Sequence, residues 1–259
     1  MKSITDDSFC HDWQLRLMEY FTRKFDTMLT LLTYPGNTAT FSLSPFCVKA
    51  AMLLAQSGQP WQREDLLDPR KMPHQKLPVM KTGERLVADS DSIRDWLEQA
   101  GMDFDPGLTP EQKAHSRALI HMAEDHLYFH IVQDRWANDT VWPIIRDIFF
   151  VAIPRWIRRP ISNSIRKSVL RGLGFQGTSR FSQSERHARL EKDLVAIANL
   201  LGDRPFLFGE QVTAADLSMG PMLSAMMETP IKTELNKRIS DDPVLSAYAE
   251  RVRKAVPLP

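Results

Sequence analysis

The chain has 259 residues, which is enough for one large domain or two ordinary domains with a full hydrophobic core. Its 33 Lys and Arg side chains nearly balance its 32 Asp and Glu side chains, so we expect no nucleic-acid partner. Cys10 and Cys47 are too few for a disulfide framework and favour a reducing compartment. The first residues have no secretory signal, and the longest apolar stretch is too short to span a membrane. We therefore expect a cytoplasmic protein.

The first residues predict a helix. Trp13, Leu17, Phe21 and Phe25 follow one another at steps of four, which places one apolar stripe on a helix. An isolated amphipathic helix has to bury such a stripe, so we expect residues 1–27 to form a helical extension that packs across the following domain.

Residues 28–104 predict a compact α/β domain. A short apolar strand begins at residue 29, and a helix follows from Pro45, with Ser44 as its N-cap and Gly58 near its end. A strand is predicted at 61–67 and a hairpin at 79–81 and 85–88, around a Thr-Gly turn. A second helix begins near residue 90 and ends near Gly101.

Residues 109–259 predict an all-helical domain after a linker rich in Gly, Pro and Asp. Thr109 and Gln112 have the spacing of a capping box and begin a long helix that runs to about Trp136. Apolar residues at helical spacing predict further helices near 190–201 and 243–252. We expect an α+β protein of two domains, an α/β domain followed by an all-α domain.

Four short segments carry a more specific signal. They are Ser44-Pro45-Phe46-Cys47, Leu77-Pro78, Asp89-Ser90, and residues 203–216 with Thr213 and Asp216 at capping-box spacing. Over about residues 28–255 the chain resembles the glutathione S-transferase superfamily, nearest its failed-axon-connections (Fax) and metaxin-like branch. The resemblance implies an N-terminal thioredoxin-like domain followed by an all-α C-terminal domain. It also implies glutathione as co-substrate, a small hydrophobic electrophile and a homodimer.

Ser44 is the catalytic candidate. It stands where thiol-type relatives carry the first cysteine of a Cys-Pro-[Phe/Tyr]-Cys motif. The resemblance implies that its hydroxyl stabilises the glutathione thiolate, and a helix N-terminus favours such an anion. The residues alone leave an alternative open, in which Ser44 is only a helix cap.

Cys47 and Tyr34 are secondary candidates. Cys47 begins the second turn of its helix among apolar residues, so we expect a small buried side chain. If it were exposed, it would form a mixed disulfide with glutathione. Tyr34 follows the first strand, and some transferases use a Tyr hydroxyl there.

The resemblance places glutathione on Leu77, Pro78, Asp89 and Ser90. It implies that Pro78 is cis and that the backbone of Leu77 pairs with the cysteinyl part of glutathione. Asp89 and Ser90 would hold the γ-glutamyl end. Each motif has a purely structural alternative, a trans proline in a loop for the first and an ordinary helix cap for the second.

The long helix carries weaker signals. By analogy with relatives, His121, Tyr128 and Trp136 would line an acceptor pocket. His126 and His130 lie four residues apart, but the His-Glu-x-x-His pattern is missing, so we expect no metal.

Residues 148–184 contain seven positive and no acidic side chains, interleaved with Trp and Ile. Such a segment contacts an anionic membrane peripherally, binds a phosphate-bearing partner or forms a solvated basic surface paired with acidic residues elsewhere. Two functions are consistent with the sequence. One is a glutathione transferase that activates the thiol for an unknown electrophile. The other is a non-catalytic interaction or membrane-surface adaptor of the Fax and metaxin type.

Overall fold

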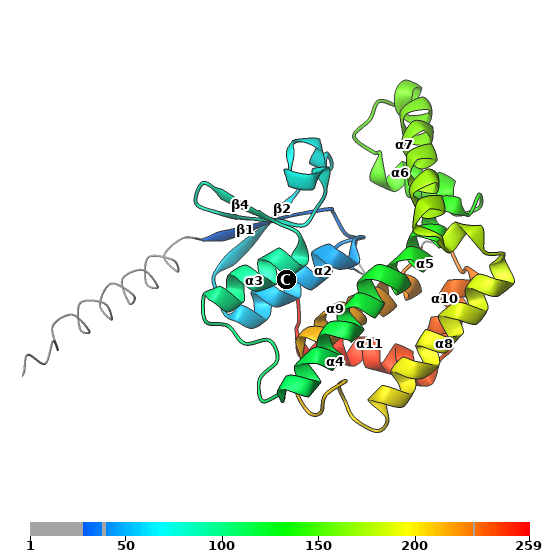
Figure 1. The fold of residues 1–259 in the computed structure, drawn as a ribbon. Coiled ribbons are helices and arrows are strands. Elements are labelled where there is room, and N and C mark those ends of the chain that lie inside the picture. The colour runs from blue at the N-terminus through cyan, green and yellow to red at the C-terminus, as the bar shows by residue number, and fades with distance from the viewer. Residues whose placement is uncertain (1–27, 38–39, 230) are drawn as a thin grey trace, which may run out of the picture.

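The computed structural model describes residues 28–37, 40–229 and 231–259. The predicted helical extension over 1–27 lies outside the described residues. Figure 1 shows a small sheet with two helices on one side, followed in the chain by a larger group of helices. This is the α+β architecture expected from the sequence.

The sheet has four strands in the order β2-β1-β3-β4. β1 (Leu29–Thr33) is parallel to β2 (Trp61–Asp65) and antiparallel to β3 (Val79–Thr82), which pairs in turn with β4 (Arg85–Ala88). α2 (Pro45–Ser57) connects the two parallel strands, and α3 (Ser90–Gln99) follows β4. Both helices pack together beside the sheet (Figure 1). The predicted order of strand, helix, strand, hairpin and helix is confirmed.

Two glycines serve the turns that the sequence predicts. Gly58 ends α2 in the left-handed conformation with φ 67°, and Gly83 occupies the hairpin turn with φ 56°. Glycine adopts a positive φ without the steric cost that a side chain adds. These turns bring the starts of α2 and α3 to neighbouring positions around the segment that precedes β3.

The rest of the chain is helical, as expected. Its helices are α4 (Pro110–His121), α5 (Tyr128–Val132), α6 (Trp142–Phe149), α7 (Arg155–Gln176), α8 (Gln183–Leu201), α9 (Ala214–Met227), α10 (Glu234–Ser240) and α11 (Pro243–Ala255). The helix predicted from Thr109 to about Trp136 is continuous, but it contains two π-helical segments, Met122–Leu127 and Gln133–Ala137. Thr109 and Gln112 form the expected capping box.

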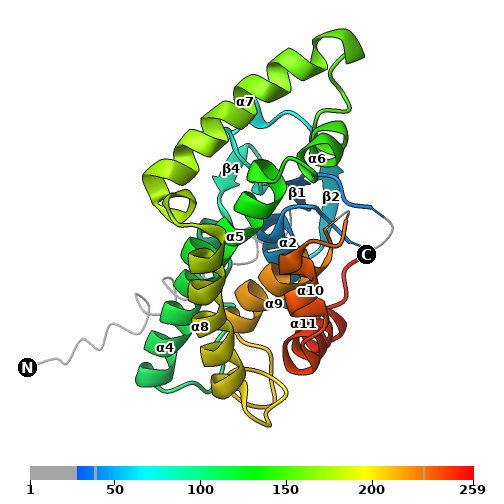
Figure 2. The ribbon, with the colours of Figure 1, turned by 90° about the vertical axis from the view of Figure 1, so that its right-hand side faces the viewer.

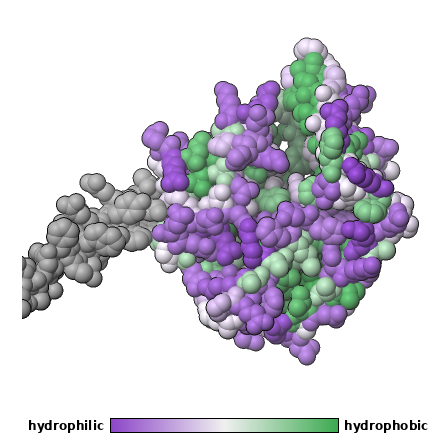
Figure 3. Space-filling view, in the orientation of Figure 1, coloured by the Kyte–Doolittle hydropathy of each residue, from purple (hydrophilic) through white to green (hydrophobic). Residues whose placement is uncertain are grey.

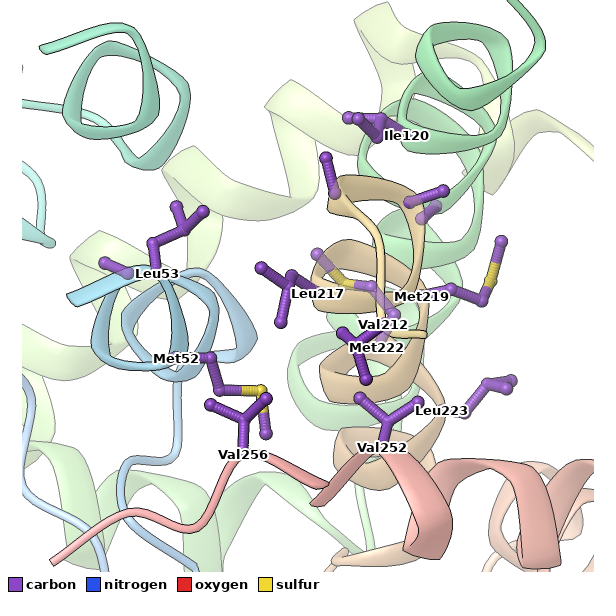
Figure 4. Packing of buried hydrophobic residues seen from close by; sticks show 14 of the residues in the cluster. Met52, Leu53, Ile120, Val212, Leu217, Met219, Met222, Leu223, Val252 and Val256 are labelled. Carbon is purple, nitrogen blue, oxygen red and sulfur yellow. The ribbon is translucent and has the colours of Figure 1, made fainter. Parts of the chain in front are cut away.

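Helix α9 is the centre of the core. All but two of its residues are buried, and it packs against α2, α4 and α11. Figure 4 shows Met52 and Leu53 of α2 facing Leu217 and Met222 of α9. The α/β and helical parts therefore share one hydrophobic core, and the position of α2 depends on both.

A buried carboxylate fixes the start of α9. One oxygen of Asp216 accepts hydrogen bonds from the backbone and hydroxyl of Thr213, at 2.8 and 2.7 Å. The other accepts from the backbone N–H of Leu207 at 2.9 Å and the hydroxyl of Tyr248 at 2.7 Å. Val212 and Leu217 flank this cap and are buried. The capping box predicted from residues 203–216 is confirmed.

An ion network that the sequence did not indicate joins the two parts. The Lys49 ammonium on α2 is almost fully buried and lies 2.6 Å from both Asp91 and Glu124. The hydroxyl of Ser218 on α9 donates to the same Glu124 oxygen at 2.8 Å. Burial alone would raise the pKa of Asp91, but Lys49 and then Arg117 lower it to about 2. The network ties α2 to helices of the second domain.

Helices α6 and α7 form a projection, which Figures 1 and 2 show extending beyond the body of the molecule. α7 is long, but only Ser162 and Leu173 are buried along it. No helix in the described residues combines the length and apolar character needed to cross a membrane.

Candidate functional site

Ser44 stands at the N-terminus of α2. Its hydroxyl oxygen accepts a long hydrogen bond, 3.5 Å, from the backbone N–H of Cys47, and its backbone is extended with φ −98°. The side chain is half-buried, and the N–H groups of the first helical turn surround it. Ser44 is thus a helix cap, and the same position offers a hydroxyl and a helix N-terminus to an anion. Its role toward a thiolate stays a prediction.

Cys47 is fully buried, as the sequence predicted. It packs with Leu32, Leu77 and Val79 behind the start of α2. Burial raises the pKa of its thiol, and hydrogen bonding, first from the Thr33 side chain, only partly opposes this. A buried thiol with a raised pKa is a poor nucleophile, so Cys47 functions as a packing residue.

The bond between Leu77 and Pro78 is cis, as the resemblance to the transferase superfamily implied. Leu77 is buried against Cys47, which places it next to the start of α2. No described group of the chain pairs with the backbone N–H or C=O of Leu77. The carbonyl of Pro78, in contrast, accepts a hydrogen bond from the N–H of Asp89 at 3.2 Å. The cis turn therefore leaves one residue with its backbone free to pair with an extended ligand.

Asp89 and Ser90 open α3 beside this turn. Asp89 has a positive φ of 80°, uncommon for a residue other than glycine, and its carboxylate accepts from the N–H of Asp91 at 2.8 Å. Ser90 is almost completely buried, yet its hydroxyl has no hydrogen-bond partner. Asp89 therefore acts as the cap, and Ser90 keeps an unused hydroxyl at a helix N-terminus. Buried polar groups are nearly always paired, so this hydroxyl is available to a ligand.

The two tyrosine candidates each contact another aromatic ring. The Tyr128 ring packs edge-on against Phe46, the residue two positions after Ser44, at 4.7 Å. The Tyr34 ring packs edge-on against Phe149 of α6 at 6.0 Å. Burial raises the pKa of both tyrosines, so both stay protonated at neutral pH. Neither hydroxyl is therefore a base in the free protein.

Trp136 also contacts aromatic rings of α6. Its ring lies 5.1 Å from Trp142 and 6.3 Å from Phe149, which in turn contacts Tyr34. His121, in contrast, is exposed at the end of α4, with its Nδ1 2.7 Å from Asp125. The structure thus connects Trp136 and Tyr34 through Phe149 and places His121 on the exposed end of α4.

His126 and His130 pack edge-on at 5.2 Å, and Nδ1 of His126 contacts Asp193. In residues 28–37, 40–229 and 231–259, no group of three or more His, Cys, Asp or Glu side chains is arranged to hold a metal ion.

Two residues of this region were missed by sequence reasoning. Phe149 contacts Tyr34, and the buried Arg135 donates to the carbonyl of Leu43, directly before Ser44, at 2.6 Å. The sequence around Arg135 predicts an ordinary helix, and the residue that Arg135 contacts is 92 positions away in the sequence. Only the long-range contact reveals its place near the site.

Two protein-family models match the chain. The glutathione S-transferase N-terminal domain matches residues 45–141, and the glutathione S-transferase C-terminal domain matches residues 190–252. The chain belongs to the glutathione S-transferase superfamily. Similarity to known proteins extends over most of the chain.

An isoprene-epoxide glutathione S-transferase of Rhodococcus is 28% identical over 88% of this chain and 98% of its own length. Failed axon connections of Drosophila melanogaster is 28% identical over 71% of this chain and 47% of its own length. Human metaxin-2 is 20% identical over 70% of each chain. The last two relatives support the resemblance to the Fax and metaxin-like branch.

The fold also matches solved structures. A glutathione transferase of Phanerochaete chrysosporium has a TM-score of 0.57 to this chain, with 19% identity over 88% of this chain and 95% of that one. The two-domain transferase fold is therefore established for this protein.

Proposed function

We propose that this protein is a glutathione transferase, with glutathione bound along Leu77, Asp89 and Ser90 and its sulfur beside Ser44. The observation that carries the proposal is the buried Ser90 hydroxyl without a partner at the start of α3. The unpaired backbone of Leu77 supports it, because a peptide-like ligand would satisfy both groups at once. The α-carboxylate of the γ-glutamyl end would bind at the helix N-terminus, and Asp89 would face the ammonium.

In this proposal Ser44 stabilises the thiolate. Its hydroxyl would donate to the sulfur, and the N-terminus of α2 would add positive potential. The thiolate then attacks the electrophile and forms a carbon–sulfur bond while the leaving bond breaks. With an epoxide, the carbon–oxygen bond breaks and the alkoxide takes a proton from water. Positioning and thiolate stabilisation would supply most of the rate.

We propose a small hydrophobic electrophile for the acceptor side. The contacts among Tyr34, Phe149 and Trp136 support this choice, since they give the region beside Ser44 an apolar, aromatic surface. The name of the Rhodococcus relative makes a small epoxide the first compound to test. We further propose cytoplasmic action as a homodimer, with domain limits at 28–104 and 109–259.

Calorimetric titration with glutathione tests the proposal. We expect binding at millimolar concentrations or below, and a loss of about tenfold in affinity for Ser90→Ala, the effect of about one hydrogen bond. Ser240→Ala is a matched control, because Ser240 is exposed at the end of α10. Its affinity should equal that of the wild type.

No detectable heat at millimolar glutathione would rule out the transferase proposal. Equal affinity of Ser90→Ala and the wild type would contradict the proposed position of the γ-glutamyl end at the start of α3.

The α6–α7 projection supports a second candidate, a peripheral role at an anionic membrane. Figure 3 shows apolar side chains over the upper part of the projection. Among the residues of the projection, Trp156 is 82% exposed and Val151 is 56% exposed. Four further side chains of the projection are cationic, exposed and without an ion pair in the described part of the chain: Arg155, Arg159, Lys167 and Arg171. Exposed Trp beside free cations is a combination that suits an anionic lipid surface.

Sedimentation with vesicles tests this candidate. We expect binding to vesicles of phosphatidylglycerol and phosphatidylcholine at low salt, and none to phosphatidylcholine alone. Reversing two charges, in Lys167→Glu/Arg171→Glu, should reduce binding by about tenfold or more, at about 1 kcal/mol per charge. The control Lys192→Glu/Lys237→Glu changes the net charge equally at exposed positions of α8 and α10. Equal binding of both variants would exclude α7 as the contact surface.

A further inference from the structure

Arg135 is a buried cation that reaches from the helical domain to the start of α2. It lies in the π-helical segment Gln133–Ala137 and is 6% exposed. Its Nη1 donates to the carbonyl of Leu43 at 2.6 Å, and its Nη2 donates to the carbonyl of Ala225 on α9 at 3.0 Å. The guanidinium therefore holds the residue before Ser44 against the centre of the helical domain.

The charge of Arg135 is not neutralised by a direct ion pair. Its Nε is buried without a hydrogen-bond partner, and no described carboxylate forms an ion pair with it. The nearby carboxylates are Asp134 and Glu228, whose pKa values burial raises above their usual range. Asp134 instead accepts a hydrogen bond from the hydroxyl of Thr233. Burying a cation without a paired anion is costly, so such a site favours an anion that arrives with a ligand.

Arg135 is hydrogen-bonded to the residue directly before Ser44, the proposed thiolate stabiliser. A single peptide bond connects Leu43 to Ser44, so the guanidinium is one residue away from the proposed thiolate stabiliser. Burial raises the pKa of the Tyr128 hydroxyl, and the positive charge of Arg135 opposes this rise, while Cys47 adds to it. Because Arg135 is buried, its charge is screened less than it would be in water.

We propose that Arg135 is a positioning residue that fixes the Leu43–Ser44 segment and supplies the buried positive charge that stabilises the glutathione thiolate. This inference rests on the proposed transferase function. It assigns part of the thiolate stabilisation to the helical domain, in addition to the Ser44 hydroxyl and the α2 N-terminus. Lysine at this position would keep the charge but lose the fork that reaches two carbonyls.

The test is the pH dependence of thiolate absorbance for glutathione bound to the wild type, Arg135→Gln and Arg135→Lys. We expect Gln to raise the thiol pKa by about 1 unit, a tenfold loss of thiolate, because a charge has been removed. Lys should stay within about 0.5 unit of the wild type, because the charge remains. Glutathione affinity, measured by calorimetry, should change less than the thiol pKa in both variants.

The outcomes separate the two proposals. Failure of the wild type to bind glutathione contradicts the transferase proposal itself. Binding with equal thiol pKa values in wild type and Arg135→Gln overturns only the role of Arg135. If Arg135→Gln does not fold, as far-ultraviolet circular dichroism would reveal, the Lys variant decides alone. A thiol pKa raised in Arg135→Lys as much as in Ser44→Ala would then overturn the inference.

Discussion

His130 is a buried imidazole whose ionisation makes stability depend on pH. Its Nε2 is buried without a partner. Burial, followed by the positive charges of His126, Arg186, His187 and Arg189, lowers its pKa from 6.5 to about 4. In the unfolded chain the His130 imidazole therefore takes up a proton below about pH 6.5. In the folded chain it stays neutral until about pH 4. The free energy of unfolding should fall as the pH falls through this window, by at most about 3 kcal/mol.

Urea denaturation at about pH 7 and about pH 4.5 checks this prediction. His130→Gln cannot take up the proton, so its free energy of unfolding should depend less on pH than that of the wild type. His115→Gln removes an exposed imidazole of α4 and should retain the wild-type dependence. An unchanged pH dependence in His130→Gln would contradict the assignment of this acid sensitivity to His130.

At the scale of single residues, the sequence predicted what local motifs determine. Ser44 as a cap and Cys47 as a buried side chain follow from short segments, and the structure confirms both. The cis bond before Pro78 was implied by the family resemblance, and the structure confirms it as well. Arg135 and Lys49 could not be predicted, because their partners lie 92 and 42 residues away. A charged residue in a helix predicts an exposed side chain unless the partner is known.

At the scale of elements, apolar periodicity located the helices that bury a face, such as α8 with Leu190, Leu194 and Ile197. It could not locate α7, because that helix buries almost nothing and its exposed apolar and basic residues give no single stripe. The two π-helical segments were also not foreseen. The apolar spacing of residues 109–136 predicted one regular helix and gave no sign of these segments. The second segment contains Arg135, which contacts Leu43 just before α2.

At the scale of the whole molecule, the proposed site depends on contact between the two domains. Core packing of α2 on α9, the ion network around Lys49 and the contact of Arg135 with Leu43 all fix α2 from the helical side. The order of elements predicted the fold, but the sequence did not show how the second domain contributes to the site. We conclude that contacts from the helical domain hold the start of α2 in place.

We propose above all that this protein binds glutathione and lowers the pKa of its thiol. The most direct measurement is a pH titration of thiolate absorbance for bound glutathione, in the wild type and in Ser44→Ala. We predict a midpoint for the wild type at least about 1 unit below that of free glutathione, whose thiol ionises near pH 8.5 as thiols ordinarily do, and a rise toward the free value in Ser44→Ala. A wild-type midpoint equal to that of free glutathione would contradict the claim.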